Sequence, residues 1–340
     1  MSYGILPQQD IADFVAQGRI TGLKTDPAHP PSVQPASLDL CLGGTAYRLR
    51  ASFLPGRDRT VRESLDFVKM HEIDLNGGAV LETGCVYLLP LCESLNLPED
   101  VEGLANPKSS TGRLDVFTRV ICDGGELFDH IPAGYSGPLY MEVAPRTFPV
   151  LVRPGDRLGQ IRFRRGAHKA LRTQHVSIDL EGDGPGAVIG YRARRHSGMV
   201  DLRGLGAHAP EDFWAPLRAP QGQLVLDPEE FYILASRESV EIPINQAAEM
   251  APIAPEIGEF RAHYAGFFDP GFGVAKQGGA GSRAVLEVRG RDVPFLLRHG
   301  QPVAKLVFET MSAIPDTLYG DQGSHYQAQG LRLSKHFSQV

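Results

Sequence analysis

Two serines and an arginine lie close together in the segment Pro107–Leu114, which reads Pro-Lys-Ser-Ser-Thr-Gly-Arg-Leu. Hydroxyl groups and a guanidinium are suitable donors for a polyphosphate, because an arginine can donate two parallel hydrogen bonds to phosphate oxygens. Ser109, Ser110 and Arg113 supply these donors, and Gly112 lets the backbone come close to a ligand. The segment therefore predicts a phosphate-binding loop. The alternative is an ordinary polar turn before a strand.

Two glutamates are flanked by residues that are typical of buried strands. Glu287 lies in Ala-Val-Leu-Glu-Val and Glu142 in Leu-Tyr-Met-Glu-Val. A carboxylate whose pKa is brought toward neutrality by burial can both accept and donate protons, as general acid and base catalysis requires. Each glutamate is thus a candidate catalytic residue. The alternatives are a solvated carboxylate on a strand face and a structural ion pair.

The chain has four cysteines, and no two of them form a Cys-x-x-Cys pair. They are Cys41, Cys85, Cys92 and Cys122. No His-x-Glu precedes such a pair either, so the spacing of a zinc site is missing. We therefore expect buried, reduced thiols and no zinc.

The elements that must position these residues occur twice in the chain. Residues 81–98 and 226–243 match at a constant offset of 145, and downstream Glu142 matches Glu287 at the same offset. A constant offset across two separated blocks predicts two copies of one domain, about residues 1–168 and 198–340. The stretch that contains Gly182–Gly186 is predicted to join them.

Both copies contain short segments rich in β-branched and aromatic residues, such as Phe148–Val152 and Leu158–Phe163. Turns are predicted at Arg153–Asp156 and Arg298–Gln301. Many short strands predict a mainly β fold of two tandem jelly-roll or distorted β-barrel domains with few short helices. One helix is expected at Gln8–Gln17, where apolar residues recur at helical spacing.

Length and charge narrow the classes of partner. The chain has 340 residues, enough for two domains, and a formal net charge of -6, which disfavours a nucleic acid polymer as partner. No apolar run approaches the roughly 20 residues that span a membrane. The N-terminus lacks the basic and apolar regions of a secretory signal. We expect a cytoplasmic protein that binds no membrane.

Several motifs resemble those of the dCTP deaminase/dUTPase family, and their order along the chain is the one expected for it. The double length is similar to a two-domain bacterial form of dCTP deaminase. The segments that carry the resemblance are Leu6–Ile20, Gln34–Gly43, Pro107–Leu114, Phe268–Phe272, Ala284–Val288 and Tyr319–Gly330. The resemblance implies dUTPase-like domains and hydrolysis of dCTP to dUTP and ammonia, with Mg²⁺ bound through the substrate triphosphate.

The resemblance also implies a role for each matching residue. Glu287 matches the catalytic carboxylate, and Glu142 is its counterpart in the first copy. The substrate-binding residues implied are Lys108, Ser109, Ser110, Gly112 and Arg113 for the triphosphate, Asp269, Val285 and Leu286 for the nucleoside, and Tyr319, His325, Tyr326 and Gln329 in a C-terminal lid. His325 replaces the usual lysine of the lid, so phosphate affinity could depend on pH.

The two copies have diverged at these positions. Where the first copy has Ser109, Ser110 and Arg113, the second has Ala254, Pro255 and Gly258, and Pro132 of the first copy stands at the position of Asp269. Because family sites lie between neighbouring domains, we predict one composite site. The phosphate loop of the first copy would face Asp269 and Glu287 of the second, with Glu142 as the alternative catalytic residue.

Three functions remain open from the sequence. The first is a dCTP deaminase. The second is a dUTP pyrophosphatase, or a bifunctional enzyme that forms dUMP directly. The third is a non-catalytic protein that binds dCTP, dUTP or dTTP. Since family trimers use three domains, a chain with two is expected to form a homo-oligomer.

Overall fold

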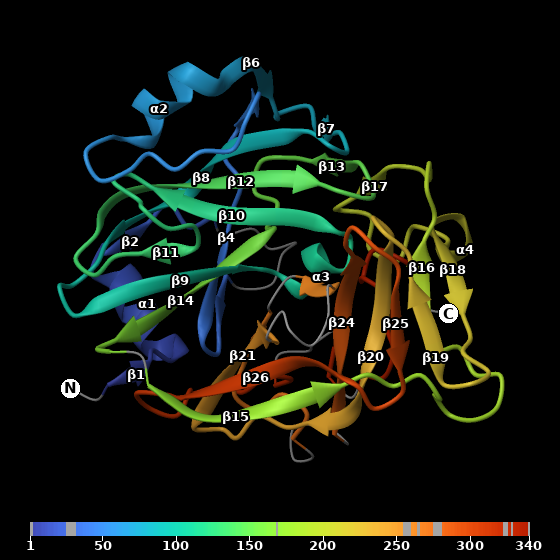
Figure 1. Cartoon of the computed structure of the whole chain (residues 1–340). Coiled ribbons are helices and arrows are strands. Elements are labelled where there is room, and N and C mark those ends of the chain that lie inside the picture. The colour runs from blue at the N-terminus through green and yellow to red at the C-terminus, as the bar shows by residue number, and fades with distance from the viewer. Residues whose placement is uncertain are drawn as a thin grey trace.

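The chain folds into two β-sheet units that follow one another in sequence (Figure 1). The computed structural model describes residues 3–24, 32–167, 169–253, 260–263, 266–274, 281–321, 326–327 and 329–338. The helices within this part are short: α1 (Gln8–Ala16), α2 (Val61–Val68), α3 (Ser109–Gly112) and α4 (Pro210–Phe213). The predicted mainly β fold with few short helices is confirmed.

The first unit is built from two six-stranded sheets. One has the order β11 (His130–Ile131), β9 (Val101–Pro107), β14 (Gly159–Arg165), β4 (Ser37–Leu40), β3 (Val33–Gln34), with β1 (Gly4–Ile5) beside β14. The other has the order β10 (Val116–Cys122), β12 (Ser136–Pro145), β8 (Val86–Asn96), β5 (Thr45–Leu49), β6 (Lys69–Asp74), with β2 (Ile20–Thr21) beside β8. A small sheet joins β17 (Val200–Asp201), β13 (Val150–Val152) and β7 (Ala79–Leu81).

The second unit also contains two larger sheets and one small sheet. A four-stranded sheet has the order β15 (Ala170–Ser177), β26 (Pro302–Thr310), β21 (Gln246–Pro252), β23 (Phe267–Phe268). A five-stranded sheet has the order β18 (Trp214–Leu217), β16 (Gly190–Ala193), β20 (Phe231–Val240), β24 (Ser282–Gly290), β22 (Phe260–His263). The strands β19 (Gln223–Leu226) and β25 (Phe295–Arg298) form a separate pair.

The strand register repeats at the offset of 145 residues. In the first unit, β12 pairs with β8 and places Glu142 opposite Leu88. In the second, β24 pairs with β20 and places Glu287 opposite Ile233. The two glutamates therefore occupy the same position in equivalent antiparallel ladders.

The second unit begins before residue 198, where the sequence places its start. β15 pairs with β26, and β16 pairs with β20, so the unit begins near residue 170. The stretch Gly182–Gly186 lies between β15 and β16 and is a loop within this unit, not the linker. β15 escapes a sequence-based prediction because its first residues are mostly polar and exposed.

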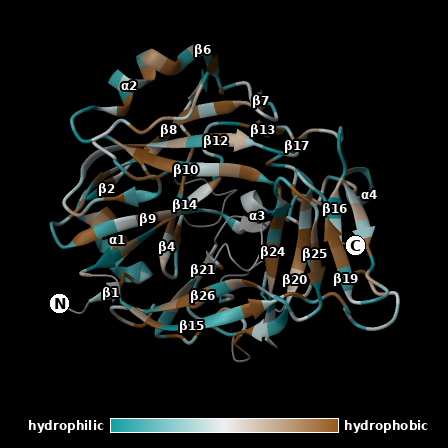
Figure 2. Cartoon of the chain, in the orientation of Figure 1, coloured by the Kyte–Doolittle hydropathy of each residue, from teal (hydrophilic) through white to brown (hydrophobic). Residues whose placement is uncertain are grey.

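Two large apolar cores hold the units together, and the first core is completed by the second half of the chain. Figure 2 shows hydrophobic residues along β10 and β24. The ring of Phe148 in the first unit packs against Trp214, with ring centroids 5.2 Å apart. Leu333 and Phe337 are buried in the same core. The second half of the chain also supplies β17, which runs parallel to β13 of the first unit. The two units thus share side chains and strands.

Two further expectations concern thiols and membranes. All four cysteines are free, and Cys41 and Cys122 are buried, whereas Cys85 and Cys92 are half-buried. Burial raises the pKa of the Cys122 thiol to about 12 and that of Cys41 to about 11. Within the described residues, no helix combines the length and apolar character needed to cross a membrane.

Candidate active site between the two units

The predicted phosphate loop forms the short helix α3, which lies at the boundary of the units beside β24 (Figure 1). It follows β9 directly, and the backbone N–H of Lys108 donates to the carbonyl of Leu158 at 2.9 Å. Ser110 and Gly112 are buried, and Ser109 is half-buried. The loop is therefore held by the first unit and faces the second.

Glu287 and Arg113 meet across this boundary. Because side chains alternate along a strand, Val285 and Glu287 of β24 face the same way, and Val285 packs into the first core while Leu286 packs into the second. Glu287 is 5% exposed, and its Oε1 lies 3.8 Å from Nε of Arg113. This Nε is buried and makes no hydrogen bond within the described part of the chain. The pair is therefore a charge contact, not a hydrogen bond.

The environment of Glu287 sets its proton affinity. Burial raises the pKa of its carboxyl from 4.5 to about 8, and attraction to the Arg113 guanidinium partly opposes that rise. A carboxyl with this pKa exists in both protonation states near neutral pH. It can therefore serve as acid and as base in one reaction cycle.

The C-terminal segment closes over Arg113. Nη2 of Arg113 donates to Oε1 of Gln329 at 3.0 Å, and Nη1 donates to the carbonyl of Arg332 at 3.1 Å. The guanidinium also lies 4.0 Å from the centroid of the Tyr326 ring, in cation–π geometry. Gln329 donates in turn to the carbonyl of Arg283, so it ties the segment to both units. Tyr326 and Gln329, two residues of the predicted lid, thus contact Arg113 of the predicted phosphate loop.

Tyr319, another residue of the predicted lid, contacts the turn that contains Phe272. The ring of Tyr319 packs on Phe272 at 5.3 Å, and its N–H donates to the carbonyl of Pro270 at 2.8 Å. Tyr319 therefore supports the predicted nucleoside turn. The following lie outside the described residues: His325, Ala254, Pro255 and Gly258.

Asp269 lies among charged residues that sequence reasoning missed. Nη2 of Arg162, on β14, donates to Oδ1 of Asp269 at 3.2 Å. Burial raises the pKa of the Asp269 carboxyl, and Arg162 opposes that rise. Asp39, close enough to act on Asp269 electrostatically, forms ion pairs with Lys108 and, at 3.9 Å, with Arg157. Asp39 falls in a segment that carries the resemblance, whereas Arg162 and Arg157 have no recognisable motif.

Glu142 has a different environment from Glu287. Its Oε1 lies 3.3 Å from Nε of Arg119, the residue opposite it on β10. The Arg119 guanidinium lies over two rings, 4.4 Å from the centroid of Phe117 and 4.0 Å from that of Phe128. The structural ion pair that the sequence left open is thus present for Glu142. The register partner of Glu287 is His263 instead.

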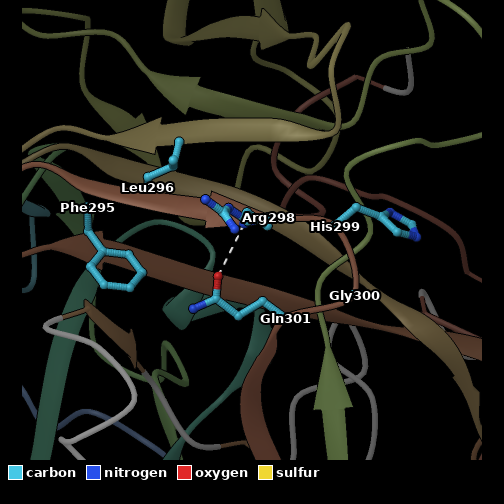
Figure 3. Close-up of a pocket in the computed structure, with 6 residues that line it drawn as sticks. All are labelled: Phe295, Leu296, Arg298, His299, Gly300 and Gln301. Atoms are coloured by element: carbon cyan, nitrogen blue, oxygen red, sulfur yellow. Dashed lines mark hydrogen bonds between the residues drawn. The ribbon is translucent and has the colours of Figure 1, made fainter.

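A separate surface pocket of about 610 Å³ lies at the turn between β25 and β26 (Figure 3). Its lining contains none of the predicted site residues, and the predicted turn Arg298–Gln301 is closed by a hydrogen bond from the Arg298 N–H to Oε1 of Gln301. In the part of the chain that the structure describes, no three His, Cys, Asp or Glu side chains are grouped so as to hold a metal ion.

Two family models cover almost the whole chain. The model described as the 2'-deoxycytidine 5'-triphosphate deaminase N-terminal domain matches residues 2–167, and the model of the C-terminal domain of the same enzyme matches residues 166–337. The chain belongs to the dCTP deaminase family.

Curated relatives match about half of the chain. A protein of Acidothermus cellulolyticus named "dCTP deaminase, dUMP-forming" is 29% identical over 158 residues, which are 46% of this chain and 78% of the relative. A protein of Beutenbergia cavernae with the same name is 28% identical over 176 residues, 52% of this chain and 86% of the relative.

A solved structure matches nearly the full length. It is titled as a crystal structure of 2'-deoxycytidine 5'-triphosphate deaminase from Agrobacterium tumefaciens. It is 52% identical to this chain, covers 92% of it and 100% of its own length, and superposes with a TM-score of 0.86. The two-unit arrangement is therefore shared with that protein.

Proposed function

We propose that this protein deaminates dCTP to dUTP and ammonia, with Glu287 as the group that carries protons. The observation that supports this most is the buried carboxyl of Glu287, whose pKa is raised to about 8 and which faces Arg113 across the unit boundary. Membership of the dCTP deaminase family and the 52% identical deaminase structure support the choice of substrate.

The proposed chemistry needs a nucleophile and two proton transfers. Glu287 takes a proton from water, which attacks C4 of the cytosine ring, and passes that proton to N3. The carboxylate then moves the hydroxyl proton to the exocyclic amino group. The bond between C4 and that amino nitrogen breaks and ammonia leaves, so the C4–O bond becomes the carbonyl of uracil. Arg113 stabilises the carboxylate form of Glu287 during these steps. The cysteine spacing suits no zinc site, so the proposal contains no zinc step.

The proposed substrate is the Mg²⁺ complex of dCTP, with the metal bound through the triphosphate. Ser109, Ser110 and the backbone of α3 would bind phosphate oxygens, and Asp269 would bind the nucleoside. The first unit thus supplies the phosphate loop, while the second supplies the nucleoside turn and the proton carrier. Glu142 is assigned a structural role, because Arg119 already pairs with it.

A bifunctional enzyme that releases dUMP is the second candidate. The curated relatives of Acidothermus cellulolyticus and Beutenbergia cavernae are named dUMP-forming, which favours this reaction. It would add hydrolysis of the bond between the α- and β-phosphates, with release of pyrophosphate.

One incubation separates these functions. Purified protein is mixed with dCTP and Mg²⁺, and ammonia, dUTP, dUMP and pyrophosphate are quantified over time. Ammonia with equimolar dUTP supports the deaminase. Ammonia with equimolar dUMP and pyrophosphate supports the bifunctional enzyme. Tight dCTP binding without any product would instead support a non-catalytic nucleotide-binding protein.

A further inference from the structure

Lys335 is held beside the phosphate loop by the side chains of its two sequence neighbours and by its own backbone N–H. The hydroxyl of Ser334 donates to the carbonyl of Ser110 in α3 at 2.8 Å. On the other side, Nε2 of His336 donates to the carbonyl of Leu202 at 3.2 Å. The N–H of Lys335 donates to the Tyr326 hydroxyl at 3.3 Å. The residue is therefore fixed against α3 without help from its side chain.

The Lys335 side chain enters a group of charges with an excess of cations. It is half-buried and close enough to Lys108 and Arg157 to feel their repulsion, and Asp39 attracts it. Asp39 already forms ion pairs with both Lys108 and Arg157. Asp269, which pairs with Arg162, also attracts Lys108, and Glu93 also attracts Arg157. Four cations thus share three carboxylates.

This excess of positive charge carries a free-energy cost. Partly buried like charges repel each other more strongly than charges in water, since the surroundings screen them less. Burial, followed by the repulsion of Lys108, lowers the pKa of the Lys335 amine. An anion that enters beside α3 would offset the excess charge. A polyphosphate, with several negative charges, suits this group better than a single carboxylate.

We propose that Lys335 is a substrate-binding residue whose ammonium group, together with Lys108, binds the triphosphate of the nucleotide held by α3. The inference rests on the proposed function and deepens it, because it assigns a cation from the C-terminal segment to the charged end of the substrate. It also gives a reason why the segment is anchored by the Ser334 and His336 side chains and by the Lys335 N–H: these anchors leave the amine available to the ligand.

The test compares nucleotide with nucleoside. Binding of Mg²⁺–dCTP and of deoxycytidine is measured by titration calorimetry in a Glu287→Gln background, which prevents turnover during the titration. Lys335→Gln is expected to raise the dissociation constant for Mg²⁺–dCTP roughly tenfold, the effect of losing one charge-assisted contact, and to leave that for deoxycytidine unchanged. Lys335→Arg should restore most of the affinity. Lys169→Gln, at an exposed lysine, is the matched control and should change neither constant.

A second measurement uses the enzyme with Glu287 in place. There, Lys335→Gln should raise KM for dCTP roughly tenfold with kcat within about twofold of its original value. Unchanged dCTP affinity, or equal weakening of dCTP and deoxycytidine binding, would overturn the assignment, because the second result indicates a displaced segment. Absence of ammonia combined with triphosphate-dependent loss of binding would refute the deaminase proposal and leave the role of Lys335 standing.

Discussion

Arg119 and Glu142 are neighbours within the first unit, with Nε and Oε1 3.3 Å apart. At the equivalent strand position of the second unit, Glu287 meets an arginine from the other unit, at 3.8 Å. One carboxylate is therefore neutralised by its own sheet and the other by a residue of the phosphate loop. The same strand position supports an ion pair in one copy and a candidate catalytic group in the other.

The two glutamates should therefore respond differently to loss of charge. Glu287→Gln removes the proposed proton carrier and should lower kcat for ammonia release by about 10²–10⁴-fold. Glu142→Gln should retain most of the turnover. Both variants are assayed with dCTP after their folding is checked by circular dichroism. Inactive Glu142→Gln beside active Glu287→Gln would reverse the assignment.

The raised pKa of Glu287 also predicts a pH-dependent stability. A carboxyl whose pKa rises from 4.5 to about 8 binds its proton more tightly in the folded state, so its stability contribution is full below pH 4.5 and is lost as the pH rises to about 8. Glu287→Gln removes this loss. We compare the free energy of unfolding of Glu287→Gln with that of the parent at each pH. The difference, variant minus parent, should be about 3–5 kcal/mol larger at pH 9 than at pH 4.5.

Urea unfolding at several pH values checks this prediction. Glu126→Gln, at an exposed side chain, serves as the control and should show no comparable pH-dependent difference. A constant difference between Glu287→Gln and the parent across this range would mean that the Glu287 carboxyl has an ordinary pKa.

Gln329 is expected to hold the C-terminal segment in its closed position. Gln329→Ala removes the acceptor for Arg113 and the donor to the Arg283 carbonyl. A hydrogen bond to a charged group contributes about 1.5–3 kcal/mol, so KM for dCTP should rise about tenfold or more. The segment should also be cut faster by proteases. Steady-state kinetics and limited proteolysis measure the two effects, and an unchanged cleavage rate would argue against this role.

A buried ion pair between the units should contribute strongly to stability. Arg289 of β24 pairs with Asp115 of the first unit and donates to the Thr147 hydroxyl at 2.9 Å. Arg289→Met leaves the Asp115 carboxylate buried without its arginine, which should cost about 3–5 kcal/mol in urea unfolding.

The matched control is an exposed pair. Arg57 and Glu126 have side chains 78% and 56% exposed, so Arg57→Met should cost at most about 1 kcal/mol. Equal costs for Arg289→Met and Arg57→Met would show that the pair between the units does not stabilise the fold.

Local patterns in the sequence predict much of this fold. Apolar spacing predicts α1, residues typical of buried strands around Glu287 predict β24, and the repeat predicts that Glu142 and Glu287 share a register. The sequence contains one signal for the helix α2, because Thr60 and Glu63 form a capping box. The helix is so short, however, that its apolar pattern does not identify it on its own.

The charged surroundings of the site could not be predicted in the same way. Arg162 reaches Asp269 from 107 residues away, and no local pattern marks either end of such a contact. Lys335 and Asp39 likewise lie far apart in the sequence. A lysine and an aspartate considered singly suggest only solvated charges. Long-range contacts of this kind depend on how the two units pack, which composition and periodicity do not encode.

The burial of Leu333 and Phe337 beside Phe148 has a consequence for synthesis. A ribosome delivers the N-terminal sheets long before the side chains that finish their interior. During that interval the nascent chain exposes the apolar surface of the incomplete core, which chaperones recognise. A premature stop codon upstream of residue 333 would therefore yield a truncated chain whose first unit lacks part of its core and is prone to misfold and aggregate.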